Sequence, residues 1–170
     1  FLTMCDTTHT ATLTIQDKVQ NAHTVVFDEI AHAINVLISL DSTPAQLTDE
    51  VAALKKALAT AQAMPDLKPT DVATKFVRAK LGRLMAQVLF DRDTCVINYK
   101  DGDTIRLLNR AIDRAGLIRG NAWVRVAEVD QAMKDLKVAY QDALKAPNKK
   151  DAPASPSFCM PAANAPITLA

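Results

Sequence analysis

The sequence predicts an all-α protein, an antiparallel four- to five-helix bundle with a small β element and a disordered C-terminal tail. Alanine, leucine and lysine are plentiful, and these residues favour helix. Apolar residues recur at three- and four-residue steps over long stretches, which is typical of amphipathic helices. Only four glycines occur among 170 residues. That scarcity disfavours a β-sandwich, and no glycine-rich phosphate loop is present.

Proline residues and polar turns divide the periodic stretches. Ser42 or Thr43 is expected to cap the second helix, with Pro44 at its first position. Thr70 is the expected cap of the third helix, and Asp103 or Thr104 that of the fourth. The predicted helices cover residues 17–40, 44–64, 71–90, 104–120 and 121–146.

Three segments are expected to lie outside the helices. "TATLTI" (10–15) alternates polar and apolar residues, so it is a short strand or part of a flexible arm. "TCVINY" (94–99) favours extended backbone and predicts a strand. Five of the eight prolines follow residue 146, which indicates an extended or disordered tail. The expected organisation is an N-terminal arm (1–16), a helical bundle domain (17–146) and a Pro/Ala-rich flexible tail (147–170).

The cysteines and the apolar runs bear on the compartment. Cys5, Cys95 and Cys159 are far apart, odd in number and form no CxxC, which predicts reduced thiols. Cys95 is then expected to be a small buried apolar residue. No apolar run reaches transmembrane length, and "FLTMCD" lacks the basic region of a signal peptide. We therefore expect no membrane partner.

Chemistry-bearing motifs are scarce. Glu29-Ile30-Ala31-His32 has the Glu-x-x-His form of di-iron bundles, but such sites need a second motif. The other histidines are His9 and His23, so no other predicted helix can supply one. Carboxylates are scattered and no nucleophile motif occurs. We expect that the protein is not an enzyme and that it binds no metal, no cofactor and no small-molecule substrate.

The charge distribution is uneven although the net charge is only +1. Residues 1–67 carry three Lys/Arg and eight Asp/Glu, whereas residues 68–126 carry twelve and six. An acidic first part and a basic middle predict an anionic partner, or an acidic face on a neighbouring copy.

Arginines in "DTIRLLNRAIDRAGLIRG" (103–120) are the candidate site. Arg106, Arg110 and Arg114 step by four residues and so lie along one side of a helix about 6 Å apart. Arg119 and Arg125 continue the basic character. Guanidinium groups suit phosphates because they donate paired hydrogen bonds. The same row is also compatible with an ordinary solvated face, paired with Asp103 or Asp113.

A second interpretation uses the residues that follow. "NRAIDRAGLIRGNAWVRVAEV" (109–129) has the form helix, glycine-containing turn, helix, with "AGL" in the turn. A helix-turn-helix would present Asn121, Trp123 and Arg125 to a DNA groove.

The arrangement resembles the rod-shaped plant-virus coat proteins of the tobacco mosaic virus type. "VINYKDGDTIRLLNRAIDRAG" resembles their strand and third helix, and "WVRVAEVDQAMKDLKVAYQDAL" their fourth helix. "IQDKVQNAHTVVFDEIAHAINVLI" and "TPAQLTDEVAALKKAL" would form the first pair. Two departures stand out: residues 71–90 are helical here where that family has extended chain, and the loop at about 116–121 is shorter.

This resemblance implies a capsid protein: a structural subunit of a virion that forms a helical or disc-shaped homo-oligomer and packages single-stranded RNA. It implies that Arg106, Arg110 and Arg114 contact RNA, and that Arg125, Glu128 and Asp130 lie at the inner radius or in inter-subunit pairs. The nucleic-acid-binding candidates are Arg106, Arg110, Arg114, Arg119 and Arg125, and the expected location is a virion or the host cytoplasm. The alternatives are a helix-turn-helix DNA-binding protein and a helical protein–protein adaptor without nucleic acid.

Overall fold

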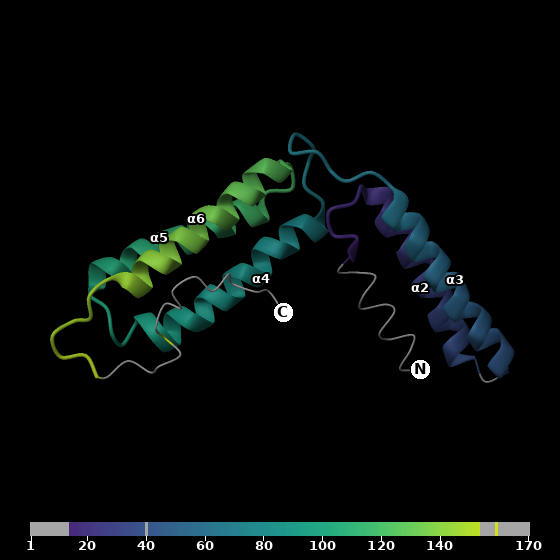
Figure 1. Cartoon of the computed structure of the whole chain (residues 1–170), viewed down its shortest axis with the longest axis horizontal. Helices are drawn as coiled ribbons and strands as arrows, with labels where there is room; N and C mark the ends of the chain where they lie inside the picture. Colours follow the sequence, from purple (N-terminus) through teal and green to yellow (C-terminus); the bar gives the residue numbers. More distant parts are fainter. Residues whose placement is uncertain (1–13, 40, 154–158, 160–170) are drawn as a thin grey trace. The chain divides into compact units, whose positions relative to one another are not determined.

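The computed structural model describes residues 14–39, 41–153 and 159, and it confirms the all-α class (Figure 1). No β-strand occurs among these residues. The chain divides at Lys68/Pro69 into two compact units, whereas the sequence predicted one bundle over 17–146. The helices are α2 (Gln20–Ile38), α3 (Pro44–Ala63), α4 (Lys75–Asp91), the π-helical η1 (Arg92–Val96), α5 (Gly102–Gly120) and α6 (Val126–Lys145).

The first unit is built on the hairpin of α2 and α3. Thr43 caps α3 as expected, because its hydroxyl accepts a hydrogen bond from the Gln46 backbone N–H, and Pro44 follows at the first position. The core between the two helices holds Ile15, Ala22, Val26 and Ala61. A second small cluster joins Ala33 to Leu54.

Backbone hydrogen bonds close the open end of this hairpin. The Leu67 N–H donates to the Asp17 carbonyl at 2.7 Å, and the Val19 N–H donates to the Pro65 carbonyl at 3.3 Å. The Lys18 ammonium lies 2.9 Å from the Asp66 carboxylate. These contacts fix where the chain enters α2 and leaves α3.

The second unit contains α4, α5 and α6, which pack against one another (Figure 1). α4 begins at Lys75, and its cap is Thr74 and not the expected Thr70. Burial raises the pKa of the Tyr140 phenol on α6, and a hydrogen bond with Asp91 of α4 adds to the shift, so the phenol stays neutral. The core positions are Val77, Leu81, Leu84 and Val88 of α4, Leu108, Ile112 and Ala115 of α5, and Val129, Leu136 and Ala143 of α6.

A short pairing of extended chain joins the entry to α4 with the entry to α6. The Ala73 N–H donates to the Val124 carbonyl at 2.8 Å, and the Val126 N–H donates to the Asp71 carbonyl at 3.0 Å. Val72 and Arg125 form an isolated antiparallel bridge. This pairing is the nearest feature to the small β element that the sequence predicted.

The strand predicted at 94–99 is wrong, because the chain stays helical there. The Ile97 N–H donates to the Arg92 carbonyl at 3.0 Å, the five-residue spacing of a π-helix. The Thr94 hydroxyl donates back to the Phe90 carbonyl, and the Arg92 guanidinium reaches the Asn109 side chain of α5. Helical hydrogen bonding and burial of Val96 therefore override the β-propensity of this segment.

The expectation of reduced thiols is also wrong for two of the cysteines. Cys95 and Cys159 form a disulfide with Cα atoms 5.2 Å apart, and both residues are buried. The segment 147–170, expected to be a free tail, is thus attached to η1 at residue 159. Spacing along the sequence gave no sign of this pairing, because 64 residues separate the two cysteines.

Lys100 and Asp101 organise the chain between η1 and α5. The Lys100 ammonium donates to the Leu144 carbonyl at 2.9 Å and to the Ala146 carbonyl, so it binds the C-terminal end of α6. Burial lowers the pKa of this amine. Asp101 caps α5 by accepting from the Thr104 N–H at 2.7 Å, which lowers the pKa of its carboxyl.

The disulfide is expected to stabilise the second unit strongly. Replacing Cys159 with serine opens a loop of 64 residues and should lower the free energy of unfolding by about 4 kcal/mol. Denaturant unfolding followed by circular dichroism measures the loss. The parent protein in reductant should unfold at the same denaturant concentration as the variant; an unchanged parent midpoint in reductant would contradict the disulfide's role.

Lys100 is expected to stabilise the fold through the two carbonyls that it binds. Lys100→Met keeps the aliphatic stem but leaves those carbonyls without their donor, and should lower the free energy of unfolding by about 1–3 kcal/mol. The exposed Lys145→Met serves as the control and should change it by less than about 0.5 kcal/mol. Equal effects of the two substitutions would show that Lys100 does not secure α6.

Candidate functional site: a groove between α5 and α6

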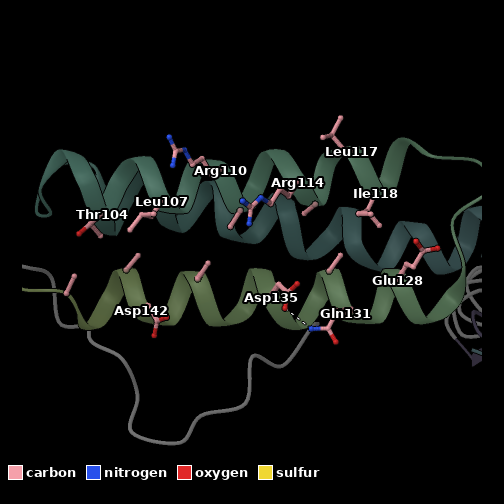
Figure 2. Close-up of a pocket in the computed structure, with 16 residues that line it drawn as sticks. Thr104, Leu107, Arg110, Arg114, Leu117, Ile118, Glu128, Gln131, Asp135 and Asp142 are labelled. Carbon is pink, nitrogen blue, oxygen red and sulfur yellow. Dashed lines mark hydrogen bonds between the residues drawn. The ribbon is translucent and has the colours of Figure 1, made fainter.

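A groove of about 910 Å³ runs between α5 and α6 (Figure 2). The residues that line the groove belong to α5, to α6 and to the position directly after α6. Small and apolar side chains form its floor: Ala111, Ala115 and Ile118 of α5, and Ala132, Ala139 and Ala143 of α6, continued by Ala146.

Residue spacing explains why the groove exists. On α6 the alanines recur at residues 132, 139 and 143, steps of seven and four that place them on one side of a helix. Alanine side chains leave the space beside the backbone open where leucine would fill it. Leu107 and Leu117 of α5 also line the groove and are 62% and 75% exposed. The groove is therefore an apolar surface open to solvent.

The two edges of the groove carry opposite charge (Figure 2). Arg110 and Arg114 extend from α5, whereas Asp135 and Asp142 extend from α6. Asp135 accepts a hydrogen bond from the Gln131 side chain at 2.7 Å, which holds its carboxylate beside α6. A ligand in the groove would meet a basic edge and an acidic edge with an apolar floor between them.

The five predicted arginines have different surroundings in the structure, and their binding of nucleic acid stays a prediction. Arg110 and Arg114 lie together at the groove, but Arg106 is exposed and pairs with Asp103 at 3.0 Å. Arg119 lies across α4, where a Cβ placed on Gly82 would come within 2.8 Å of its Nε. The absence of a side chain at Gly82 thus gives Arg119 its place.

Arg125 belongs to the scaffold of the second unit. Its guanidinium donates to the Thr70 carbonyl, and its backbone N–H donates to the Glu128 carboxylate at 2.8 Å. The first bond joins the start of α6 to the chain that leads into α4, and the second caps α6. Arg125 is therefore engaged within the fold, and Glu128 both caps α6 and lines the groove.

The helix-turn-helix interpretation fails on geometry. α5 continues without interruption through the residues "AGL" to Gly120, so Gly116 lies inside a helix. The turn occupies residues 121–125. Trp123 in that turn is 81% exposed and does not lie on the second helix as the interpretation required.

A polar cluster on the first unit joins the Glu-x-x-His motif to a residue that the sequence analysis did not connect with it. The ligand atoms of Glu29, His32 and Glu50 all lie within 4.8 Å of one another. His32 Nδ1 is 3.0 Å from Glu50 Oε2, which joins α2 to α3. The Glu-x-x-His motif therefore gains its third polar group from the facing helix.

Among the helices that the structure describes, none combines the length and apolar character needed to cross a membrane.

The fold and the groove define an all-α protein with an open apolar groove between two helices. The family model "CAMP factor (Cfa)" matches residues 2–144, so the chain belongs to the CAMP factor family. It is 38% identical to Protein B of Streptococcus agalactiae over 116 residues, which are 68% of this chain and 50% of that protein.

Two solved structures agree with the family assignment. The CAMP factor of Mobiluncus curtisii has a TM-score of 0.82 and 28% identity, covering 86% of this chain and 66% of that one. GBS CAMP factor has a TM-score of 0.81 and 28% identity, covering 85% and 68%. The chain thus spans half the length of the curated relative that it matches and about two thirds of each structure.

These matches correct the functional expectations. The resemblance to plant-virus coat proteins is wrong, because family model, curated relative and structures all point to a bacterial family. The expectations that depended on it are therefore also wrong: capsid formation, RNA packaging and location in a virion or the host cytoplasm. DNA binding and the adaptor role find no support either. Four-helix coat proteins and this family share helical periodicity, which explains why pattern alone misled.

The different roles of Arg125 and Arg106 can be tested by measuring the free energy of unfolding of two variants. Arg125→Gln removes the bond to Thr70 and should lower the free energy of unfolding by about 1 kcal/mol. Arg106→Gln removes only an exposed ion pair and should change it by less than about 0.5 kcal/mol. Urea unfolding of both variants tests this; a larger loss for Arg106→Gln would contradict the assignment.

Proposed function

We propose that this chain is part of a secreted bacterial protein that acts by binding, not by catalysis, and that the α5–α6 groove holds an amphipathic helix of a protein partner. The observation that carries the proposal is an open apolar groove with one basic and one acidic edge. The chain matches half the length of Protein B, and the proposal concerns this matched part.

Secretion is supported by the disulfide. Disulfides persist in oxidising surroundings such as the extracellular space, and are rare in the reducing cytosol. Cys95 and Cys159 attach a Pro/Ala-rich segment to the second unit, so reduction would release a structural contact. A protein that depends on such a bond is best suited to work outside the cell.

Binding is supported by the chemistry of the groove lining. Thr104 contributes the one hydroxyl group among the lining residues, and no histidine or cysteine lies there. The floor consists of methyl and aliphatic groups, which offer apolar contact and no nucleophile. We therefore propose a surface for recognition.

A helix is the ligand that fits this surface. From Thr104 to Ile118 the groove follows α5 for about 21 Å, the length of four turns of helix. Each large apolar side chain that enters contributes about 1.5–3 kcal/mol by leaving water. Acidic residues on one flank of the helix would face Arg110 and Arg114, and basic residues on the other would face Asp135 and Asp142. Helix-in-groove recognition uses apolar anchors at this spacing.

A synthetic helical peptide tests the proposal. The probe carries leucine at positions i, i+3, i+4 and i+7, glutamate on one flank and lysine on the other. Its fluorescence anisotropy should rise with added protein, and Ala139→Phe, which fills the floor, should weaken binding at least about tenfold.

The matched control is Ala127→Phe, an equal enlargement at an exposed position of α6 outside the groove. It should bind the probe as the parent does. Binding that is absent in the parent, or equally strong in Ala139→Phe with the fold retained by circular dichroism, would refute the groove as a helix site.

A further inference from the structure

Three polar side chains bridge the two helices of the first unit, α2 and α3, which lie side by side (Figure 1). Glu29 and His32 belong to α2, and the step of three residues places them on one side of that helix. Glu50 belongs to α3, and the ligand atoms of all three side chains lie within 4.8 Å of one another. We call these three residues the hairpin cluster. It combines one imidazole with two carboxylates from both helices of the hairpin.

We propose that the hairpin cluster binds one divalent transition-metal ion, and that Zn²⁺ is the ion that suits it best. The proposal is independent of the α5–α6 groove. It replaces the sequence expectation that the protein binds no metal, which assumed that a Glu-x-x-His motif needs a second motif of the same kind. Here the facing helix supplies the carboxylate of Glu50 instead.

Distances within the hairpin cluster suit a small metal ion. Nδ1 of His32 lies 3.0 Å from Oε2 of Glu50. Zinc bonds to imidazole nitrogen and carboxylate oxygen are about 2.0–2.2 Å long, so two ligands of a tetrahedral zinc ion lie about 3.3–3.6 Å apart. These two side chains therefore need to separate by only a fraction of an ångström to admit an ion between them. Rotation of the Glu29 side chain brings in the third ligand.

The distribution of charge along both helices favours a cation at this position. α2 contains no lysine or arginine, and neither residue type occurs within one turn of Glu50, at residues 46–54. The Glu50 side chain is only 12% exposed, and Glu29 is partly buried. Two carboxylates held this close together repel each other. A divalent ion offsets both negative charges, whereas His32 offsets one at most.

The imidazole of His32 determines which ions fit. A mixed set of imidazole and carboxylate ligands suits zinc and related transition metals, whereas Ca²⁺ and Mg²⁺ prefer sites made only of oxygen atoms. The His32 side chain is 65% exposed, so an ion bound there is within reach of solvent. Water then completes the coordination of the zinc ion, and the ion exchanges with the surrounding solution.

Metal binding would cross-link a part of the hairpin where the apolar core is small. Beside the hairpin cluster, the buried core residues are Ala33 and Leu54. The backbone hydrogen bonds of residues 17–19 with residues 65–67 close the opposite end of the hairpin. An ion that binds the folded chain and not the unfolded chain stabilises the fold by mass action. We therefore expect zinc to raise the unfolding temperature of the first unit.

Isothermal titration calorimetry of the untagged full chain with zinc chloride tests the proposal. The parent should bind one zinc ion at this site, and calcium or magnesium chloride should not compete with it. His32→Ala, Glu29→Gln and Glu50→Gln each remove a ligand and should each weaken zinc binding at least about tenfold. Asp49→Asn is the matched control, because it removes an exposed carboxylate of α3 next to Glu50 in the sequence but outside the hairpin cluster. It should bind zinc as the parent does.

Thermal unfolding distinguishes a metal site from an ordinary hydrogen-bonded pair. In the presence of a chelator, His32→Ala should unfold at nearly the same temperature as the parent, because His32 is exposed and its pairing with Glu50 contributes little. Zinc at a concentration that saturates only the parent site should raise the midpoint of the parent and of Asp49→Asn. It should leave His32→Ala and Glu50→Gln unchanged. Circular dichroism confirms that each variant is folded before it is compared.

Three results would overturn the proposal. A parent that binds no zinc refutes the site. Zinc binding that survives in both His32→Ala and Glu50→Gln places the ion elsewhere in the chain. Calcium that competes with zinc on equal terms shows that the hairpin cluster attracts cations by negative charge alone and is not a transition-metal site.

Discussion

The central constraint on the second unit is that one helix cannot cover both sides of a helix pair. α4 packs against α5 and α6 and buries Leu108 and Leu136 between the three helices. The other side of the pair has no fourth helix among the described residues, and it is lined by alanines. Because those side chains are small, the uncovered side is a groove and not a ridge. The proposed function follows from this geometry.

Several contacts hold the groove in shape from its two ends. At one end, Lys100 binds the last carbonyls of α6, and Asp101 caps α5 directly beside it in the sequence. At the other end, Arg125 and the extended pairing with residues 69–73 fix the start of α6. Both helices are thus secured at their termini while their exposed sides stay accessible, which is the arrangement expected of a preorganised binding surface.

Much of the helical architecture followed from periodicity. α2, α3, α4 and α6 lie close to the predicted ranges, and Thr43 caps α3 as its position before Pro44 indicated. The strand predicted at 94–99 does not form, although Val96 and Ile97 favour extended chain. Their preference is overridden where a preceding helix continues through the segment. Here the hydrogen bonds of η1 continue it.

The site was harder to foresee, for two physical reasons. Periodicity identifies which side of α6 is apolar, but the steps between residues 132, 139 and 143 indicate a groove only once α5 is known to lie beside them. The disulfide joins residues 64 positions apart, and local patterns contain no information on such a distance. The arginines illustrate a third point, because they look alike in sequence and differ only in their neighbours. Arg106 forms an exposed ion pair and Arg110 lies at the edge of the groove. Arg119 and Arg125 contact other parts of the second unit.

The claim that the groove receives an apolar helix is tested most directly by methyl NMR of alanine-labelled protein during titration with the synthetic amphipathic peptide. The account predicts that the methyl signals of Ala111, Ala132 and Ala139 shift together and saturate, while that of Ala127 stays in place. Shifts confined to alanines outside the groove, or no shift while the peptide binds, would contradict it.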